Sequence, residues 1–328
     1  MENYEEGIIT EDQKNGKKDF SCVGLAYFSL LAITITCQLL INTIIFNTYV
    51  LIPRWLLYVI GILPMYLLAA PVCILIFQKI PASGHLECKK WEFKKLLLCF
   101  MIAVGVSYLG NFLSQIIVAI GSHILGRAMV NPAMDFVMNT NMVINIIIVV
   151  IIAPIIEEIL FRKVLLDRIC VYGEGTAVLV SGLTFALFHG NLFQVLYAFL
   201  LGIIFAYVYV KTKQIKYCIG LHMAINFLGS VVSVMLLNGV DIEALNSGRM
   251  EFMILQLPRL LLILVYGFAM FSCMIASIVV IICQRKKIIL NPGATPVLAG
   301  KRFRTIFLNA GMILFFCGCG FLFYFNTV

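Results

Sequence analysis

Two adjacent glutamates, Glu157 and Glu158, lie inside a long apolar run, and Arg162 follows them by about one helical turn. A carboxylate in the hydrocarbon core of a membrane costs at least about 2.5 kcal/mol, so charges at such positions mark a site or a tightly paired structure. Glu158 and Arg162 are spaced i and i+4 with the acid first, which favours an ion pair on one helix face. Glu157 points about 100° away from that face. Its carboxylate therefore suits a general base that accepts a proton from water.

The same three charges could instead brace a bundle of helices, because buried ion pairs are also structural devices. Glu157, which lacks an equally good partner on its own helix, counts against this alternative. Pro154 lies about one turn before Glu157 and cannot donate a backbone hydrogen bond. We therefore expect a kink at Pro154 that opens room for water.

Two histidines occur in later apolar runs, each with a helical partner. Phe185 precedes His189 by four residues, and Gly190 then ends the run, so His189 is expected at a tight bend. His222 and Asn226 share one helix face and offer an imidazole and an amide, a suitable donor pair for a developing oxyanion. Either histidine alone could simply be a hydrogen-bonding residue between helices.

Together these residues supply the parts for a hydrolysis reaction. Glu157 and His189 could hold and deprotonate a water molecule, while His222 and Asn226 could stabilise the tetrahedral intermediate. The alternative is a zinc site with Glu157, His189 and His222 as ligands. The residues by themselves do not choose between these two sites.

Several other catalytic signatures are absent from the sequence. It contains no His-Glu-x-x-His zinc motif, no Gly-x-Ser-x-Gly nucleophile motif and no Gly-x-Gly-Asp motif. The eleven cysteines form no Cys-x-x-Cys pair and no metal-type spacing with histidine.

The elements that must position these residues are membrane helices. The chain is 62% hydrophobic and only 12% charged, with a mean hydropathy of +1.02, which excludes a soluble globular domain. Runs of about 20 apolar residues can cross the hydrocarbon core as helices. We therefore predict an all-α, polytopic transmembrane bundle with eight or nine spans. The predicted spans are 22–46, 55–78, 96–121, 142–169, 176–189, 191–210, 217–238, 260–283 and 305–325.

Lysine and arginine gather in alternate loops, which predicts the orientation of the chain. The basic loops are 79–95, 170–175, 211–216 and 284–304, and we place them with the N-terminus in the cytoplasm. The poorly basic loops are 47–54, 122–141 and 239–259. The net charge of +8 is then a topology signal that matches anionic lipids, and we predict no nucleic-acid partner.

Four regions follow from this pattern. Residues 1–21 form a cytoplasmic tail, 22–140 scaffold transmembrane helices, 141–238 a catalytic core, and 239–328 C-terminal transmembrane helices. One difficulty concerns depth, because His189 should lie at or beyond the midplane whereas His222 lies only a few residues into its span. The two can meet only if the short 176–189 helix tilts or enters part-way, or if 217–238 starts deeper.

Three spaced motifs carry a resemblance to a known family. Glu157-Glu158-x-x-x-Arg162, Phe185-x-x-x-His189 and His222-x-x-x-Asn226, in this order, resemble the CPBP family, also called the CAAX protease and bacteriocin-processing, or Abi, family. The family includes the type II CAAX prenyl endopeptidases, and the match covers about residues 140–238.

The resemblance implies an intramembrane endopeptidase of the glutamate type, although the family has also been described as metal-dependent. With the resemblance, we favour a site without a metal or other cofactor, because Glu157 and His189 suffice for general-base chemistry. It implies that Glu157 activates water, that His189 assists, that His222 and Asn226 form the oxyanion hole, and that Glu158, Arg162 and Phe185 support the site. The expected partners are the lipid bilayer and a peptide or protein substrate within or at the membrane. The expected location is the plasma membrane of a bacterium. The alternative function is a non-catalytic bacteriocin-immunity or scaffold protein.

Overall fold

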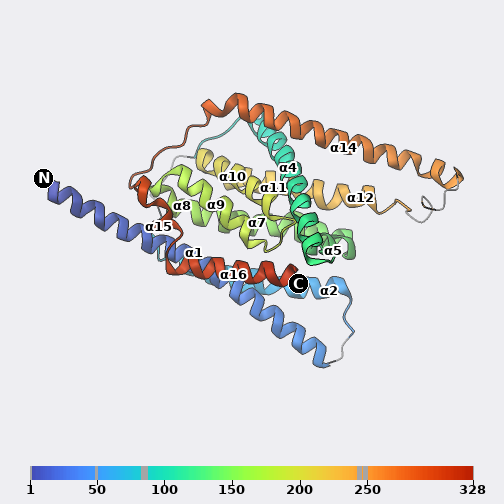
Figure 1. Ribbon diagram of the computed structural model, residues 1–328, viewed down its shortest axis with the longest axis horizontal. Coiled ribbons are helices and arrows are strands. Elements are labelled where there is room, and N and C mark those ends of the chain that lie inside the picture. Colours follow the sequence, from blue (N-terminus) through green and yellow to red (C-terminus); the bar gives the residue numbers. More distant parts are fainter. Residues whose placement is uncertain (1, 49–50, 83–87, 242–245, 247–249, 328) are drawn as a thin grey trace.

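The computed structural model describes residues 2–48, 51–82, 88–241, 246 and 250–327, and within these residues every regular element is a helix (Figure 1). The first half contains α1 (Glu2–Thr48), α2 (Arg54–Pro64), η1 (Met65–Ala69), α3 (Ala70–Phe77), α4 (Phe93–Leu125), α5 (Pro132–Asn139), α6 (Met142–Asn145), η2 (Ile146–Ile152), α7 (Ala153–Glu158), η3 (Ile159–Val164), α8 (Leu165–Ile169) and η4 (Cys170–Tyr172). The second half contains α9 (Glu174–Phe188), α10 (Val195–Thr212), α11 (Ile215–Phe227), η5 (Leu228–Val232), α12 (Ser233–Leu237), α14 (Met250–Gln284), η6 (Arg285–Lys287), η7 (Ala299–Lys301), α15 (Arg302–Ile306) and α16 (Ala310–Thr327).

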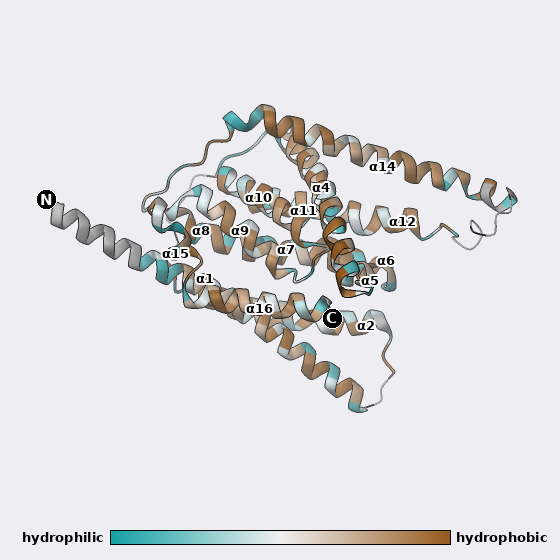
Figure 2. Cartoon of the chain, viewed as in Figure 1, coloured by the Kyte–Doolittle hydropathy of each residue, from teal (hydrophilic) through white to brown (hydrophobic). Residues whose placement is uncertain are grey.

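The protein is an all-α membrane bundle, as the apolar runs predict. Within the described residues, seven helices are long and apolar enough to cross a membrane, and α9 and α16 are shorter apolar helices. Each of these nine helices coincides with one of the predicted spans, with boundaries that differ by a few residues. Side chains on the outward faces are largely apolar, as Figure 2 shows along α14, where Leu255 is 79% exposed. Lipid tails would cover such a surface.

The short length of α9 explains how His189 and His222 can lie at a similar depth in the membrane. Its 15 residues span only about 22 Å at 1.5 Å per residue, less than the roughly 30 Å of a hydrocarbon core. A helix that starts at one interface therefore ends inside the bilayer, and His189 follows its last residue, Phe188. Part-way entry of α9, the first option allowed by the sequence, is thus sufficient.

The helices around α10 form the centre of the molecule. α10 packs against α9 on one side and α4 on the other, α14 packs against α4, and α1 packs with α16 and α3 (Figure 1). Small residues allow these close approaches: a Cβ on Gly202 of α10 would lie 2.8 Å from the Cα of Gly182 in α9. Close backbone contact between small residues is a usual source of helix association in lipid.

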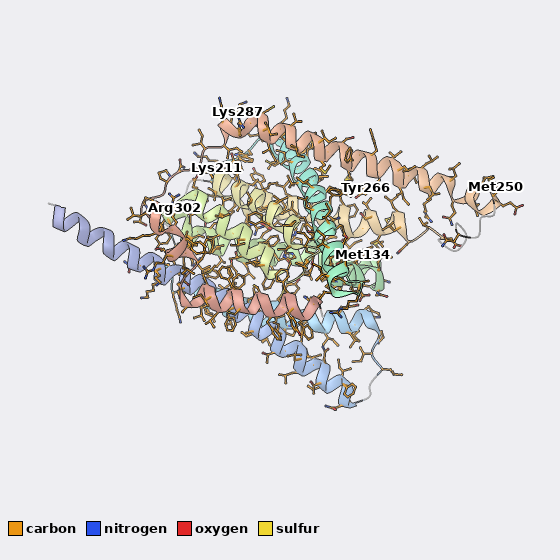
Figure 3. All side chains as sticks on the ribbon, in the orientation of Figure 1. Met134, Lys211, Met250, Tyr266, Lys287 and Arg302 are labelled. Carbon is orange, nitrogen blue, oxygen red and sulfur yellow. The ribbon has the colours of Figure 1, made fainter. Side chains whose placement is uncertain are left out.

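The four basic loops meet at one end of the bundle. The Lys89 N–H donates to the Thr212 carbonyl at 2.9 Å, and the Thr295 N–H donates to the Val171 carbonyl at 3.0 Å. Glu174 accepts from the Lys211 ammonium at 2.5 Å and also from the side chain and backbone of Asn291. Figure 3 shows Lys211, Lys287 and Arg302 at this end, and Met250 and Met134 toward the other. The two sets of loops assigned to opposite sides of the membrane are therefore separated in space.

Candidate active site

A cavity of about 520 Å³ lies in the centre of the bundle, and the predicted catalytic side chains converge on it. Glu157 of α7, His189 after α9, and His222 and Asn226 of α11 all line it, as does Phe185. The remaining wall comes from α2, η1, α4, α5, the segment from η2 to α7, the bend after His189, α10, η5 and α12, with Asn131 just before α5. Side chains from three separate sequence motifs therefore border one shared space.

Glu158 and Arg162 lie behind this wall rather than on it. Both side chains are 0% exposed, and Arg162 Nε lies 3.0 Å from Glu158 Oε2. The N–H of Arg162 is not aligned for a hydrogen bond to that oxygen, and neither Nη1 nor Nη2 has a hydrogen-bond partner among the described residues. The two side chains therefore attract each other by charge, and aromatic rings cover the guanidinium. The Arg162 Cζ lies 4.4 Å from the Phe185 ring centroid and 5.8 Å from that of Phe205, and such cation–π contacts stabilise a desolvated guanidinium.

His222 lies between the two glutamates. Its Nδ1 is 2.9 Å from Glu158 Oε1, and its Nε2 is 3.8 Å from Glu157 Oε2. A carboxylate that is paired with Arg162 accepts hydrogen bonds, so the Nδ1 of His222 carries a proton and donates it. The second ring nitrogen, Nε2, therefore faces Glu157 and the cavity.

His189 is oriented by the helix that it follows. Its Nδ1 lies 2.7 Å from the Phe185 carbonyl oxygen, one turn back. Since a carbonyl can only accept, this Nδ1 also carries the proton, and Nε2 is left with a lone pair. The His189 ring stands edge-on to the Phe185 ring, with centroids 4.8 Å apart. The imidazole thus packs on the same phenylalanine ring as His222 and presents a proton acceptor to the cavity.

Phe185 is the aromatic centre of the site. Its ring also contacts His222, with centroids 5.8 Å apart, and Phe161, at 5.3 Å. Together with the Arg162 and His189 contacts, these place one buried ring against the Arg162 guanidinium and both imidazoles. Phe185 therefore packs against three of the polar side chains of the site at once.

The helix that carries Glu157 changes its hydrogen-bond pattern just before that residue. In the π-helical η2, the Ala153 N–H donates to Ile148, five residues back. The next donor in this register would be residue 154, but Pro154 has no N–H, so the Val149 carbonyl receives no bond from its own helix. The Asn226 amide fills that place, with Nδ2 2.9 Å from the Val149 oxygen. Before Pro154 the structure thus has a π-helical stretch that docks a second helix, while the expected kink with room for water stays a prediction.

A second asparagine makes the reciprocal contact, and the sequence did not single it out. Asn145 is 1% exposed, and its Nδ2 donates to the Ser230 carbonyl in the π-helical η5 at 2.8 Å. Asn145 and Asn226 therefore each bond a backbone carbonyl on the other's helix. The available signal was a lone amide inside the apolar run 142–156, because polar side chains inside membrane helices usually have a partner.

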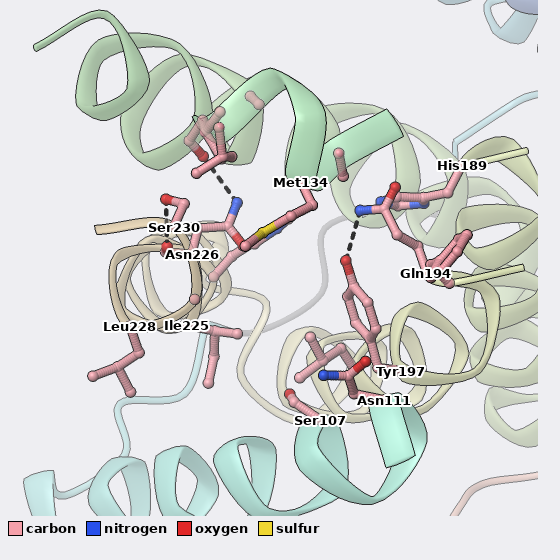
Figure 4. Close-up of a pocket in the computed structure, with 18 of the residues that line it drawn as sticks. Ser107, Asn111, Met134, His189, Gln194, Tyr197, Ile225, Asn226, Leu228 and Ser230 are labelled. Atoms are coloured by element: carbon pink, nitrogen blue, oxygen red, sulfur yellow. Dashed lines mark hydrogen bonds between the residues drawn. The ribbon is translucent and has the colours of Figure 1, made fainter. Parts of the chain in front are cut away.

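The bend after His189 is held by several polar contacts that the sequence also left unnoticed. Gly190 has φ of +62°, and a Cβ there would lie 2.2 Å from Leu322 in α16. The Asn326 amide of α16 donates to the Gly190 carbonyl at 2.9 Å. Inside the bend, Asn191 bonds Gln194, and Gln194 in turn bonds Tyr197. Figure 4 shows Gln194 and Tyr197 beside His189, with Asn226 on the opposite side of the cavity.

The cavity wall is almost uncharged. Apart from its two histidines, Glu157 is the one side chain that is charged near neutral pH among the described lining residues, while amides, hydroxyls and apolar groups form the rest. Serine, asparagine and tyrosine from the first half of the chain contribute to it, namely Tyr66, Ser107, Tyr108, Asn111 and Asn131.

The donor set does not fit a metal ion. No three His, Cys, Asp or Glu side chains in the described part of the chain are arranged to hold one together, Glu157, His189 and His222 included. A zinc site formed by these three residues therefore finds no support in the geometry.

Comparison with known proteins gives two similarities. Residues 139–228 match the model of the family described as type II CAAX prenyl endopeptidase Rce1-like. The chain is also 32% identical, over 186 residues, to the membrane-embedded CAAX protease MroQ of Staphylococcus aureus (strain USA300). That alignment covers 54% of this chain and 73% of MroQ. No solved structure matches the chain.

Proposed function

The chain belongs to the CAAX (CPBP) family of membrane-embedded proteases, and on this premise we propose that it is a glutamate-type intramembrane endopeptidase. It hydrolyses a peptide bond of a membrane-associated peptide or protein, with water activated by Glu157 and His189. The observation that carries this proposal is the convergence of Glu157, His189, His222 and Asn226, from three helical elements, on one cavity.

In the first step, the Glu157 carboxylate takes a proton from a water molecule whose oxygen attacks the scissile carbonyl carbon. His189 presents its unprotonated Nε2 to the cavity that Glu157 also lines. The imidazole can accept a hydrogen bond from the second O–H of that water. This bond orients a lone pair of the water oxygen toward the scissile carbonyl carbon. The attack forms the carbon–oxygen bond and shifts the carbonyl electron pair onto the oxyanion.

The oxyanion would be met by His222 and Asn226. One hydrogen of the Asn226 amide is used by Val149, and the second can donate into the cavity. His222 can donate from Nε2 only if both of its nitrogens are protonated. Glu157, Glu158 and Arg162 together carry one net negative charge, so a protonated His222 brings this buried cluster to neutrality. When the carbon–nitrogen bond breaks, the proton held by Glu157 passes to the departing amine.

The cavity wall favours an uncharged stretch of substrate. Its described lining contains neither lysine nor arginine, so it offers neither of these side chains to bind a free C-terminal carboxylate. Neutral amide and hydroxyl groups suit the backbone of a peptide that enters from the membrane or its surface. We therefore favour an internal peptide segment as the substrate.

The test compares membrane proteomes of cells that carry the wild type, Glu157→Gln or Glu251→Gln. The first substitution removes the base and the second makes the same chemical change on the exposed start of α14. We expect at least one cleavage product to disappear with Glu157→Gln, while Glu251→Gln behaves as wild type. All three proteins should be present in equal amounts.

Unchanged cleavage in Glu157→Gln would overturn the catalytic assignment. If a cellular phenotype of the protein persisted in that variant, the result would support the non-catalytic scaffold or immunity function instead.

A further inference from the structure

Tyr197 is a cavity residue whose position is fixed by its helix. It lies in the first turn of α10 and lines the same space as Glu157 and His189. α4 approaches α10 so closely here that a Cβ on Gly110 would lie 2.6 Å from the Tyr197 Cα. The Tyr197 ring therefore has little freedom to withdraw from the cavity.

The direction of the hydrogen bonds that reach Tyr197 can be followed from unambiguous donors and acceptors. The Gln194 backbone N–H donates to Asn191 Oδ1 at 3.0 Å, which identifies the oxygen of that amide. The other end of the amide, Nδ2, donates to the His189 carbonyl at 3.1 Å. This Nδ2 also lies 2.6 Å from Gln194 Oε1, so the Gln194 side-chain oxygen is the acceptor in that contact.

With its oxygen used in this way, Gln194 must turn its NH₂ group toward Tyr197. Gln194 Nε2 lies 2.6 Å from the Tyr197 hydroxyl oxygen, and Figure 4 shows this contact as a dashed line. Since the amide donates, the tyrosine oxygen accepts, and the hydroxyl proton is not used in this bond. Within the described part of the chain the structure gives that hydroxyl no second partner. A donor in this position gains from any acceptor that enters the cavity.

We propose that the Tyr197 hydroxyl donates a hydrogen bond to a backbone carbonyl oxygen of the peptide bound beside Glu157. A peptide carbonyl oxygen is an acceptor and therefore matches the O–H of Tyr197, whose proton is not used in the bond from Gln194. This inference rests on the proposed function and names one contact by which the site holds its substrate. Tyr197 is then a substrate-binding residue, and Asn191 and Gln194 position it by fixing the direction of its proton.

The test uses an internally quenched peptide that copies a cleavage site mapped by comparing the membrane proteomes of cells with and without the protein, and it uses protein in lipid nanodiscs. Tyr197→Phe should lower kcat/KM about tenfold, the effect of one lost hydrogen bond. Gln194→Glu should cause a similar loss although Tyr197 is intact, because a carboxylate takes the phenolic proton for itself. Gln194→Met, which cannot accept that proton strongly, should lose clearly less kcat/KM than Gln194→Glu.

Tyr207→Phe is the matched control. It makes the same change on the same helix, at a ring that contacts Trp91 rather than the cavity, and should leave kcat/KM unchanged. The inference fails if Tyr197→Phe keeps more than half of the wild-type kcat/KM. It also fails if Gln194→Met is as impaired as Gln194→Glu, since the direction of the proton would then be irrelevant. Should Tyr197→Phe not fold, the two Gln194 variants decide.

A binding measurement separates this inference from the proposed function. A dye-labelled copy of the same peptide is titrated into Glu157→Gln protein, with and without Tyr197→Phe, and followed by fluorescence anisotropy. We expect Kd to rise about tenfold when the hydroxyl is removed. If Glu157→Gln still cleaves but Kd rises, the mechanism is wrong and the contact is right. If Glu157→Gln is inactive and Kd is unchanged, the contact is wrong and the mechanism is right.

Discussion

His222 Nδ1 lies 2.9 Å from Glu158 Oε1, and Glu158 is fully buried while its neighbour Glu157 lines the cavity. Two consecutive glutamates thus occupy different surroundings. Glu158 is bonded to an imidazole and paired with Arg162, whereas Glu157 is 14% exposed to the cavity. Because adjacent residues on a helix point about 100° apart, one motif can supply both a support for the site and a group that meets the substrate.

Glu158→Gln should therefore damage stability more than Glu157→Gln. Removing the Glu158 charge leaves the Arg162 guanidinium buried without a counter-ion, and breaking such a pair costs about 3–5 kcal/mol. Thermal unfolding in detergent, followed by size-exclusion chromatography, should give a clearly lower midpoint for Glu158→Gln. Glu157→Gln should unfold close to the wild-type temperature.

The double variant Glu158→Gln/Arg162→Gln provides the control for this prediction. It leaves no isolated charge in the bundle, so it should recover part of the stability that Glu158→Gln loses. Equal midpoints for Glu157→Gln and Glu158→Gln would contradict the assignment of Glu158 to a supporting position.

The two asparagines that join α11 to the helix of Glu157 should separate stability from activity. Asn145→Ala and Asn226→Ala each remove one amide–carbonyl bond between the same two helices, worth about 0.6–2 kcal/mol in a membrane. Both should lower the unfolding midpoint by similar amounts. Only Asn226 lines the cavity, so only Asn226→Ala should also lose most of its kcat. A comparable loss of kcat in both variants would mean that helix docking, and not the amide itself, limits catalysis.

Much of the fold could be predicted from the sequence, because membrane helices are encoded locally. Each predicted apolar span is a helix in the structure, and the i, i+4 spacing was enough to predict the pairing of Glu158 with Arg162. The partners of other residues could not be predicted, because they come from distant parts of the chain. Val149 is 77 residues from Asn226, and Ser230 is 85 residues from Asn145.

The hydrogen bonds within the bend after His189 could not be predicted from the sequence either. Asn191, Gln194 and Tyr197 look like ordinary polar residues near a helix start, and only the folded turn connects their hydrogen bonds into one directed chain. The π-helical register before Pro154 is a further example. The proline predicted a disturbance, but which carbonyl it would free depends on the docking of α11.

The orientation of the bundle in the membrane can be tested by labelling single cysteines. The four basic loops gather at one end, and basic loops are normally cytoplasmic. In a cysteine-free background, Val130→Cys lies in the poorly basic loop 122–141 and Lys287→Cys in the basic loop 284–304. A membrane-impermeant maleimide should label Val130→Cys in intact cells and Lys287→Cys only after permeabilisation. The reverse pattern would place the N-terminus outside.

Pro154→Ala should reduce activity by restoring a backbone donor. The new N–H can bond the Val149 carbonyl within its own helix, which competes with the Asn226 amide for that oxygen. We expect a stable, correctly inserted protein whose kcat/KM falls several-fold as Asn226 loses its anchor. The structure of the helix itself should not suffer, since alanine is the best helix former.

A double-mutant cycle checks this reason for the loss. If Pro154→Ala acts through Asn226, then adding it to Asn226→Ala should cost little further activity, because residues that share one contact are not additive. Independent, additive losses would show that Pro154 acts in another way, for example by shaping the backbone beneath Glu157. Val150→Ala, another buried small apolar change in the same helix, controls for a general effect of altered packing and should leave the dependence on Asn226 intact.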